Sequence, residues 1–166
     1  MTLRSGSGIN FIVETGASER AKIGTAMPTA SIREALKDAA LFAALDESEL
    51  NSLAARCGLR SYEPNAILFG EGEPCAGLYI VTSGRIRIFK TSPAGREQVL
   101  AVEGPGASVA ELPVFDGGPY PASAAAIEPT SALFISRPDL RALCLEHPQI
   151  TLKMLQVVGA RLRRLV

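Results

Sequence analysis

An excess of charge of either sign is missing from this 166-residue sequence: 17 Lys and Arg residues balance 17 Asp and Glu residues, so the formal net charge is +0. A domain that binds nucleic acid electrostatically carries a clear basic excess. We therefore expect this chain to make no direct contact with DNA or RNA. An apolar run long enough to cross a bilayer is missing as well, and we expect no membrane contact.

Metal-ligating and nucleophilic residues are also scarce. His147 is the only histidine, and the three cysteines, Cys57, Cys75 and Cys144, are scattered and odd in number. Such cysteines favour reduced, idle thiols in a cytoplasmic protein over a disulfide framework or an iron–sulfur cluster. No common catalytic motif or set of metal ligands occurs. We therefore predict neither a metal site nor an enzyme, and we interpret His147 as a helix cap or a surface residue.

Length and composition predict one globular domain with appendages. Residues 1–30 are rich in Gly, Ser, Thr and Ala, so we expect a flexible leader there that lacks the apolar core of a signal peptide. Order is expected from Ser31, because Ser31 and Glu34 have the spacing of a capping box at the start of a helix. Asp46 is the predicted N-cap of a second helix.

Residues 59–136 change to short β-prone runs, separated by Gly, Pro, Ser and Asn at intervals of about ten residues. Arg85, Ile86, Arg87 and Ile88 alternate as a half-buried strand does, which predicts that both arginines point outward to solvent. About eight strands are expected, a number that favours a double-sheet jelly roll or a closed barrel. The predicted strands include residues 59–62, 66–69, 85–88, 97–102, 122–127 and 132–136.

Two further helices are predicted after the strands. Ser136 caps the first, which carries Pro138 in its first turn, and Pro148 ends it and begins the second. The second helix repeats apolar residues at intervals of three, four and three, the spacing of a coiled-coil seam, at Leu155, Val158, Leu162 and Leu165. We expect this seam to form a homodimer, with packing on the chain's own barrel as the alternative. The surrounding basic residues are predicted to form a solvated face: Lys153, Arg161, Arg163 and Arg164.

Four segments carry a resemblance to a known family: LFGEGEP (68–74), GLYIVTSGRIRIFK (77–90), GPGASVAELPVFDGGPYPASAAA (104–126) and SRPDLRALCLEHPQI (136–150). With the order of elements, they make the chain resemble the sensor half of the Crp/Fnr family of bacterial transcription regulators. The resemblance implies a mainly β fold with flanking helices, a double-stranded β-helix or jelly-roll barrel of the cyclic-nucleotide-binding type. It places this roll over residues 31–148 and the start of a long C-terminal dimerisation helix over residues 149–166.

The third segment is similar to the family's phosphate-binding cassette, in which a helical turn presents N–H groups to the cyclic phosphate. Glu111 matches the family's Glu that takes a ribose hydroxyl, and Ala110 stands where the family usually has Gly. The family's phosphate-binding Arg is missing, because Tyr120 or Pro121 occupies its position, depending on where one gap is placed. Residues 97–136 contain no Lys or Arg at all.

This loss bears directly on the ligand. A charge-assisted hydrogen bond contributes about 1.5–3 kcal/mol of binding free energy, and the resemblance also places Leu165 and Val166 where nucleotide binders have hydroxyl side chains for the base. We therefore expect weak or absent cyclic-nucleotide binding, with a cyclic-AMP-like nucleotide as a disfavoured candidate. Either a neutral or less anionic effector binds, with Glu111 and Ser123 as polar anchors, or the pocket is a packed relic. The predicted pocket residues are Ala110, Glu111, Leu112, Tyr120, Pro121, Ala122 and Ser123.

Two functions remain open on the sequence. The first is the effector-sensing and dimerisation domain of a Crp/Fnr-like regulator, in which an effector under the cassette changes how the long helix packs. The DNA-binding winged helix of such a regulator would follow Val166, and we expect it to be absent from this chain. The second is a stand-alone cyclic-nucleotide-fold module, which binds a nucleotide or a protein partner without contacting DNA.

Overall fold

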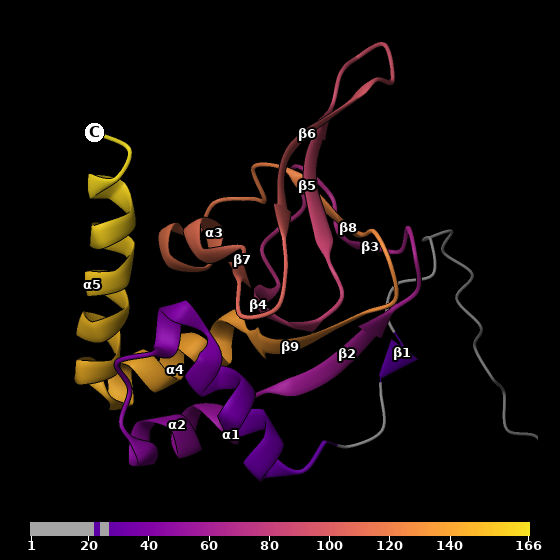
Figure 1. The fold of residues 1–166 in the computed structure, drawn as a ribbon. Coiled ribbons are helices and arrows are strands. Elements are labelled where there is room, and N and C mark those ends of the chain that lie inside the picture. The colour runs from indigo at the N-terminus through magenta and orange to yellow at the C-terminus, as the bar shows by residue number, and fades with distance from the viewer. Residues whose placement is uncertain (1–21, 24–26) are drawn as a thin grey trace, which may run out of the picture.

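The computed structural model describes residues 22–23 and 27–166. These residues form two antiparallel sheets flanked by helices (Figure 1). The five-stranded sheet has the order β1-β2-β9-β4-β7, and the four-stranded sheet has the order β3-β8-β5-β6. The strands are β1 (Lys22–Ile23), β2 (Gly58–Tyr62), β3 (Ile67–Phe69), β4 (Gly77–Ser83), β5 (Ile86–Thr91), β6 (Glu97–Glu103), β7 (Ser108–Val109), β8 (Ser123–Ala126) and β9 (Thr130–Ser136). The helices are α1 (Thr29–Asp38), α2 (Glu47–Ala54), α3 (Glu111–Asp116), α4 (Arg137–Glu146) and α5 (Pro148–Arg163), with a 3-10 turn over Ala40–Phe42. The predicted mainly β jelly roll with flanking helices is confirmed.

Strand β4 explains why the molecule has two cores. Its side chains alternate between the faces of the five-stranded sheet, so that Leu78 and Ile80 pack against the helices, whereas Tyr79 and Val81 lie between the two sheets. Because both faces are covered, the strand reads as a continuous apolar run. Gly77 is required at its start, since a Cβ there would lie 2.2 Å from the carbonyl oxygen of Ile135 on β9.

Helix α1 begins earlier than predicted. Its N-cap is Pro28, whose carbonyl accepts hydrogen bonds from the N–H groups of Ser31 and Ile32 at 2.9 and 3.1 Å. Ser31 is therefore inside the helix, and the prediction of a capping box by Ser31 and Glu34 is wrong. The reason is that the backbone of Pro28 provides the first carbonyl, and no side-chain cap is present.

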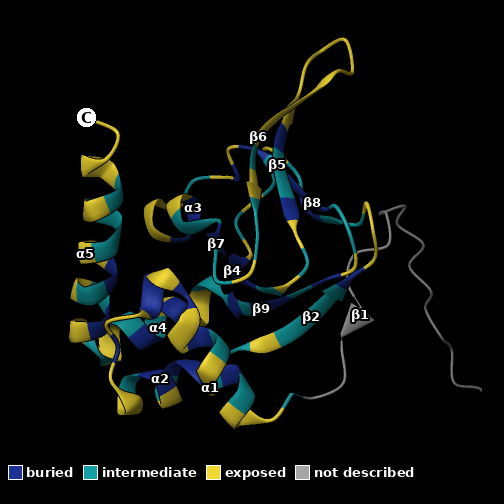
Figure 2. Cartoon of the chain, viewed as in Figure 1, coloured by how far each residue is buried: buried dark blue, intermediate teal, exposed yellow. Residues whose placement is uncertain are grey.

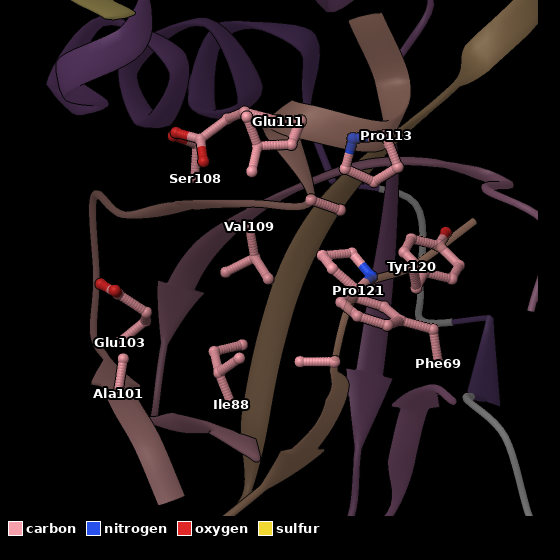
Figure 3. A pocket seen from close by; sticks show the side chains of 13 residues that line it. Phe69, Ile88, Ala101, Glu103, Ser108, Val109, Glu111, Pro113, Tyr120 and Pro121 are labelled. Carbon is pink, nitrogen blue, oxygen red and sulfur yellow. The ribbon is translucent and has the colours of Figure 1, made fainter. Parts of the chain in front are cut away.

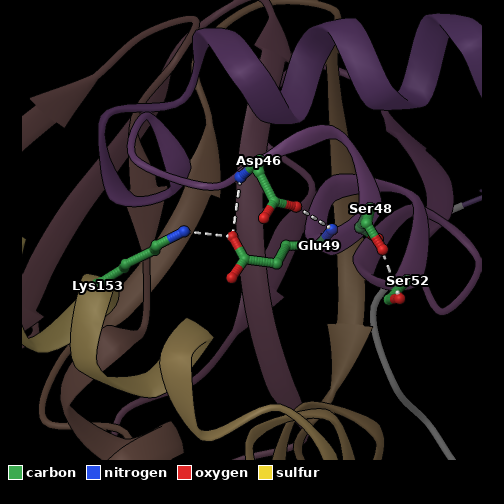
Figure 4. Close-up of polar contacts among 5 residues, drawn as sticks. All are labelled: Asp46, Ser48, Glu49, Ser52 and Lys153. Atoms are coloured by element: carbon green, nitrogen blue, oxygen red, sulfur yellow. Dashed lines mark hydrogen bonds and ion pairs between the residues drawn. The ribbon is translucent and has the colours of Figure 1, made fainter.

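The caps of α2 and α4 are as predicted. Asp46 accepts a hydrogen bond from the N–H of Glu49 at 2.8 Å, and the Glu49 carboxylate accepts one from the N–H of Asp46 at 2.8 Å, which completes a capping box (Figure 4). Ser136 accepts a hydrogen bond from the N–H of Asp139 at 3.1 Å at the start of α4. His147 is the cap residue between α4 and α5, as the sequence predicted.

Helix α5 is attached to the body of the domain through its first half. Ile150 and Met154 are buried in the helical core, and Lys153 donates to the Glu49 carboxylate at 2.6 Å (Figure 4). The prediction that Lys153 belongs to a solvated face is therefore wrong, because it joins α5 to the capping box of α2. The second half of α5 rises beside α3 with an exposed outer face (Figure 2).

The range predicted as a leader, residues 1–30, lies mostly outside the described residues. Within it the structure places β1, which pairs with β2 through Lys22 opposite Ser61 and Ile23 opposite Arg60, and the first two residues of α1. In the part of the chain that is described, no helix has the length and apolar character needed to span a bilayer.

Candidate functional site

The site begins where β7 leads into α3. Ala110, the residue between them, has a φ of 75°, in the left-handed region that glycine adopts most easily. Alanine thus occupies the backbone conformation that a family glycine would occupy. This left-handed turn leads directly into α3 and places Glu111, the first residue of the helix, in the lining of a cavity.

A cavity of about 230 Å³ lies beneath α3, between β5 and β6 on one side and residues 120–122 on the other (Figure 3). This volume is below the roughly 300–1,000 Å³ of sites for drug-sized ligands. Six of the predicted pocket residues line it, and Ser123 does not. The lining residues are Phe69, Ile88, Ala101, Glu103, Ser108, Val109, Ala110, Glu111, Leu112, Pro113, Tyr120, Pro121 and Ala122. The Ser123 hydroxyl instead accepts a hydrogen bond from the N–H of Glu71 at 2.9 Å.

Tyr120 forms the inner wall of this cavity. It is buried, and its ring stacks on Phe69 with the ring centroids 3.9 Å apart. Its hydroxyl accepts hydrogen bonds from the N–H groups of Ala76 at 2.9 Å and Gly77 at 3.4 Å. Burial raises the pKa of Tyr120, so the phenol stays neutral. The hydroxyl points away from the cavity, and Tyr120 supplies an apolar surface to a ligand (Figure 3).

Replacement of Tyr120 by Phe is expected to destabilise the domain. The change keeps the stacked ring but leaves the N–H of Ala76 without its acceptor, which costs about 1–3 kcal/mol of unfolding free energy. Chemical denaturation of the native protein and the Tyr120→Phe variant would measure this difference. A change of less than about 0.5 kcal/mol, the usual scatter of neutral surface substitutions, would contradict the structural role of the hydroxyl.

Tyr120 and Pro121 were the two candidates for the position of the missing arginine. Because Tyr120 is buried, a charged side chain at that position would have to displace part of the core. Pro121 is exposed and lines the cavity, so an arginine at this position would reach both the cavity and solvent.

Glu111 is held by a residue of the long helix. Its carboxylate accepts hydrogen bonds from the hydroxyl of Ser108 and from the guanidinium of Arg161, and Arg161 also donates to Ser108 at 3.5 Å. The prediction that Arg161 lies on a solvated face is therefore wrong. Sequence reasoning missed this contact because 50 residues separate the partners, and no local pattern marks one arginine of α5 as different from its neighbours.

The two arginines of the β4–β5 region do not supply a cation to the cavity. Arg85 is outside the roll, 56% exposed, and pairs with Glu128 at 3.1 Å, which confirms its predicted outward position. Arg87 is only 21% exposed because it pairs with Glu97 at 3.4 Å and lies over the ring of Phe89. The prediction of a solvated Arg87 is wrong, although it too stays outside the cavity.

The predicted seam residues of α5 are placed differently from one another. Leu155 and Leu162 are 56% and 59% exposed, and Leu165 is exposed beyond the last helical turn. Val158 packs in part against the chain's own helical core. Leu152, which the sequence analysis did not select, is exposed on the same side of the helix as Leu155.

The cysteines show no arrangement for chemistry. Cys57, Cys75 and Cys144 are free and half-buried, and burial raises the pKa of Cys57 to about 12, which makes its thiolate inaccessible at neutral pH. Among residues 22–23 and 27–166, no group of three or more His, Cys, Asp or Glu side chains could hold a metal ion.

The fold and the site together define a class of protein: a two-sheet β-roll with a small cavity, one of whose lining residues, Glu111, is bonded to Arg161 of the C-terminal helix α5. The chain belongs to the cyclic nucleotide-binding domain family, since residues 59–147 match that family's sequence profile.

Relatives of the chain include transcription regulators. It is 34% identical over 131 residues to the CRP-like cAMP-activated global transcriptional regulator of Mycobacterium tuberculosis (strain CDC 1551 / Oshkosh), which covers 79% of this chain and 58% of that protein. The chain thus spans less than two thirds of that relative. A crystal structure of the N-terminal domain of a transcriptional regulator from Streptomyces coelicolor A3(2) is similar with a TM-score of 0.69 and 36% identity, over 78% of this chain and 91% of that one.

Fungal enzymes also have a segment similar to this domain. Lysophospholipase NTE1 of Phaeosphaeria nodorum (strain SN15 / ATCC MYA-4574 / FGSC 10173) is 35% identical over 100 residues, which are 60% of this chain and 7% of that protein. The similar segment is therefore a small part of a much longer chain.

Proposed function

We propose that the chain is the effector-sensing and dimerisation domain of a Crp/Fnr-like transcription regulator. The observation that carries the proposal is the contact between Arg161 of α5 and Glu111 at the cavity, because it links the pocket to the long helix. An effector in this cavity lies against Glu111, so it perturbs the contact with Arg161 and changes how the last turns of α5 pack. DNA binding would belong to another domain of such a regulator, and the free cysteines fit a cytoplasmic protein.

The pocket of this domain binds cyclic nucleotides weakly or not at all. Its only charged lining residues are Glu103 and Glu111, so a phosphodiester would lose its hydration and meet carboxylates. Arg161 is the one guanidinium bonded to a lining residue in the described part of the chain, and it is already engaged by Glu111 and Ser108. A phosphate that recruited it would first have to break this ion pair.

The dimer in this proposal forms through the exposed face of α5. Leu152, Leu155, Gly159 and Leu162 recur at intervals of three, four and three residues, as in a coiled-coil seam. A Cβ added to Gly159 would meet no atom within 4 Å, so this face is open. Val158 is turned toward the domain's own core. The proposed seam is therefore the exposed stripe of Leu152, Leu155, Gly159 and Leu162, which shares Leu155 and Leu162 with the seam predicted from the sequence.

Amide hydrogen exchange of α5 tests the link between the pocket and the helix. The Arg161→Gln variant removes the ion pair with Glu111, and for this half-exposed pair the loss is about 0.5–1 kcal/mol. We expect exchange in the last two turns of α5 to become about two- to fivefold faster, while exchange in the sheets is unchanged.

Arg163→Gln is the matched control, because Arg163 is exposed in the same turns and forms no ion pair within the residues that the structure describes. This variant should leave the exchange rates as they are. Equal exchange in the native protein and both variants would show that the Glu111 contact does not hold α5, and it would remove the observation on which the proposal rests.

A further inference from the structure

The cavity has one acidic end and one apolar end. The carboxylates of Glu103 and Glu111 lie at one side in Figure 3, and the rings of Phe69, Tyr120 and Pro121 lie at the other. This separation matches a ligand that has a polar group at one end of an apolar body.

The two carboxylates at the acidic end are not equivalent. Glu111 is neutralised by Arg161 and also accepts a hydrogen bond from Ser108. Glu103, at the end of β6, takes part in none of the ion pairs that the structure shows within residues 22–23 and 27–166. The wall of the cavity therefore carries one negative charge that no side chain of the described domain neutralises by a direct ion pair.

This charge decides between classes of ligand. An anion would be repelled by Glu103 and would leave its own charge without a partner. A neutral hydroxyl would donate one hydrogen bond to the carboxylate. An ammonium group would form a charge-assisted hydrogen bond with Glu103 and would also neutralise the charge of this carboxylate. Charge-assisted hydrogen bonds are about twice as strong as neutral ones.

We propose that the effector of this pocket is a small organic amine, whose ammonium group pairs with Glu103 and whose apolar body lies against Phe69 and Pro121. The inference rests on the proposed function, because it names the chemical class of the effector in the same cavity. The volume of about 230 Å³ limits the apolar body to roughly one ring with a short chain.

Three probes of nearly equal size and shape test the charge preference: 2-phenylethylamine, 2-phenylethanol and phenylacetate, which are a cation, a neutral molecule and an anion at pH 7. Isothermal titration calorimetry of the whole chain at low salt should give a dissociation constant near 1 mM for the amine. The alcohol should bind about 10- to 100-fold more weakly, and the acid should show no binding.

The Glu103→Gln variant removes the charge and keeps the size of the side chain. In this variant the amine should bind no better than the alcohol, and the alcohol should bind as it does to the native protein. Glu63→Gln is the control, because Glu63 is exposed, takes part in none of the ion pairs within the described residues and does not line the cavity, and it should leave both affinities unchanged.

Equal affinity for amine and alcohol, tighter binding of the acid, or an unchanged amine affinity in Glu103→Gln would each overturn the inference. No measurable binding of the amine at 10 mM would overturn it as well. The proposed function would survive any of these results if α5 still dimerises and its exchange still responds to Arg161→Gln, so the two failures are distinguishable.

Discussion

Leu155→Asp and Leu162→Asp are each expected to convert a dimer of this chain into a monomer. Both leucines are more than half exposed in the single chain. Burial of each side chain in the dimer seam therefore contributes about 1.5–3 kcal/mol to the free energy of association. A twofold-symmetric dimer contains each leucine twice, which doubles the loss to about 3–6 kcal/mol. The dimer dissociation constant should therefore rise about 10²- to 10⁴-fold. Sedimentation equilibrium over a wide range of concentrations measures it.

Leu145→Asp is the matched control for these variants. Leu145 is 71% exposed, but it lies on α4 rather than on the exposed stripe of α5, and its replacement should leave the dimer intact. Circular dichroism should show the same folded spectrum for all three variants, because the side chains are at the surface. If the native chain is monomeric at all concentrations, the seam is refuted and the stand-alone module becomes the better account.

Pro121→Arg is expected to increase the affinity for cyclic AMP about 10- to 100-fold. Pro121 is exposed at the rim of the cavity, so an arginine there would supply the cation that the lining lacks, without disturbing the core around Tyr120. One charge-assisted hydrogen bond to the phosphate contributes about 1.5–3 kcal/mol, which corresponds to this range. Titration calorimetry with cyclic AMP at fixed salt would compare the variant with the native protein.

Pro121→Ala separates the gain of charge from the loss of proline. It frees the same backbone N–H and relaxes the loop but adds no cation, so cyclic AMP should bind it as weakly as the native protein. If Pro121→Ala and Pro121→Arg increased the affinity for cyclic AMP equally, the weak binding of the native protein would be due to the stiff loop and not to the missing positive charge. Micromolar binding of cyclic AMP to the native protein would contradict the proposal that this pocket lacks a cation able to bind the phosphate.

Much of the fold was predictable from the sequence, because the deciding interactions are local. Asp46 and Ser136 are helix caps whose partners lie three residues away, and short-range patterns of this kind are visible in a sequence. Pro148 begins α5 for the same reason. The start of α1 differs from the prediction because Pro28 is its N-cap and no side chain caps the helix, so the spacing of Ser31 and Glu34 does not mark its first turn.

The site was predictable in its position but not in its electrostatics. The cassette segment indicated the lining residues from Ala110 to Ala122, since a family pattern fixes where the backbone runs. It did not reveal Glu103 as a wall of the same cavity, because β6 reaches the site only through its pairing with β5. The different surroundings of Arg85 and Arg87 could not be predicted either. The alternation of polar and apolar residues along a strand indicates the face on which a side chain lies, but it does not indicate the residues that the side chain contacts there.

The sequence by itself determined the caps of α2 and α4, the start of α5 at Pro148, and that no Lys or Arg stands in residues 97–136. These properties depend on neighbours within a few positions, where spacing and residue type suffice. Only the tertiary structure decided that Arg161 joins Glu111 and that Lys153 joins Glu49, across 50 and 104 residues. An ion pair between distant segments has no periodic signature, because it exists only after folding brings the two charges together.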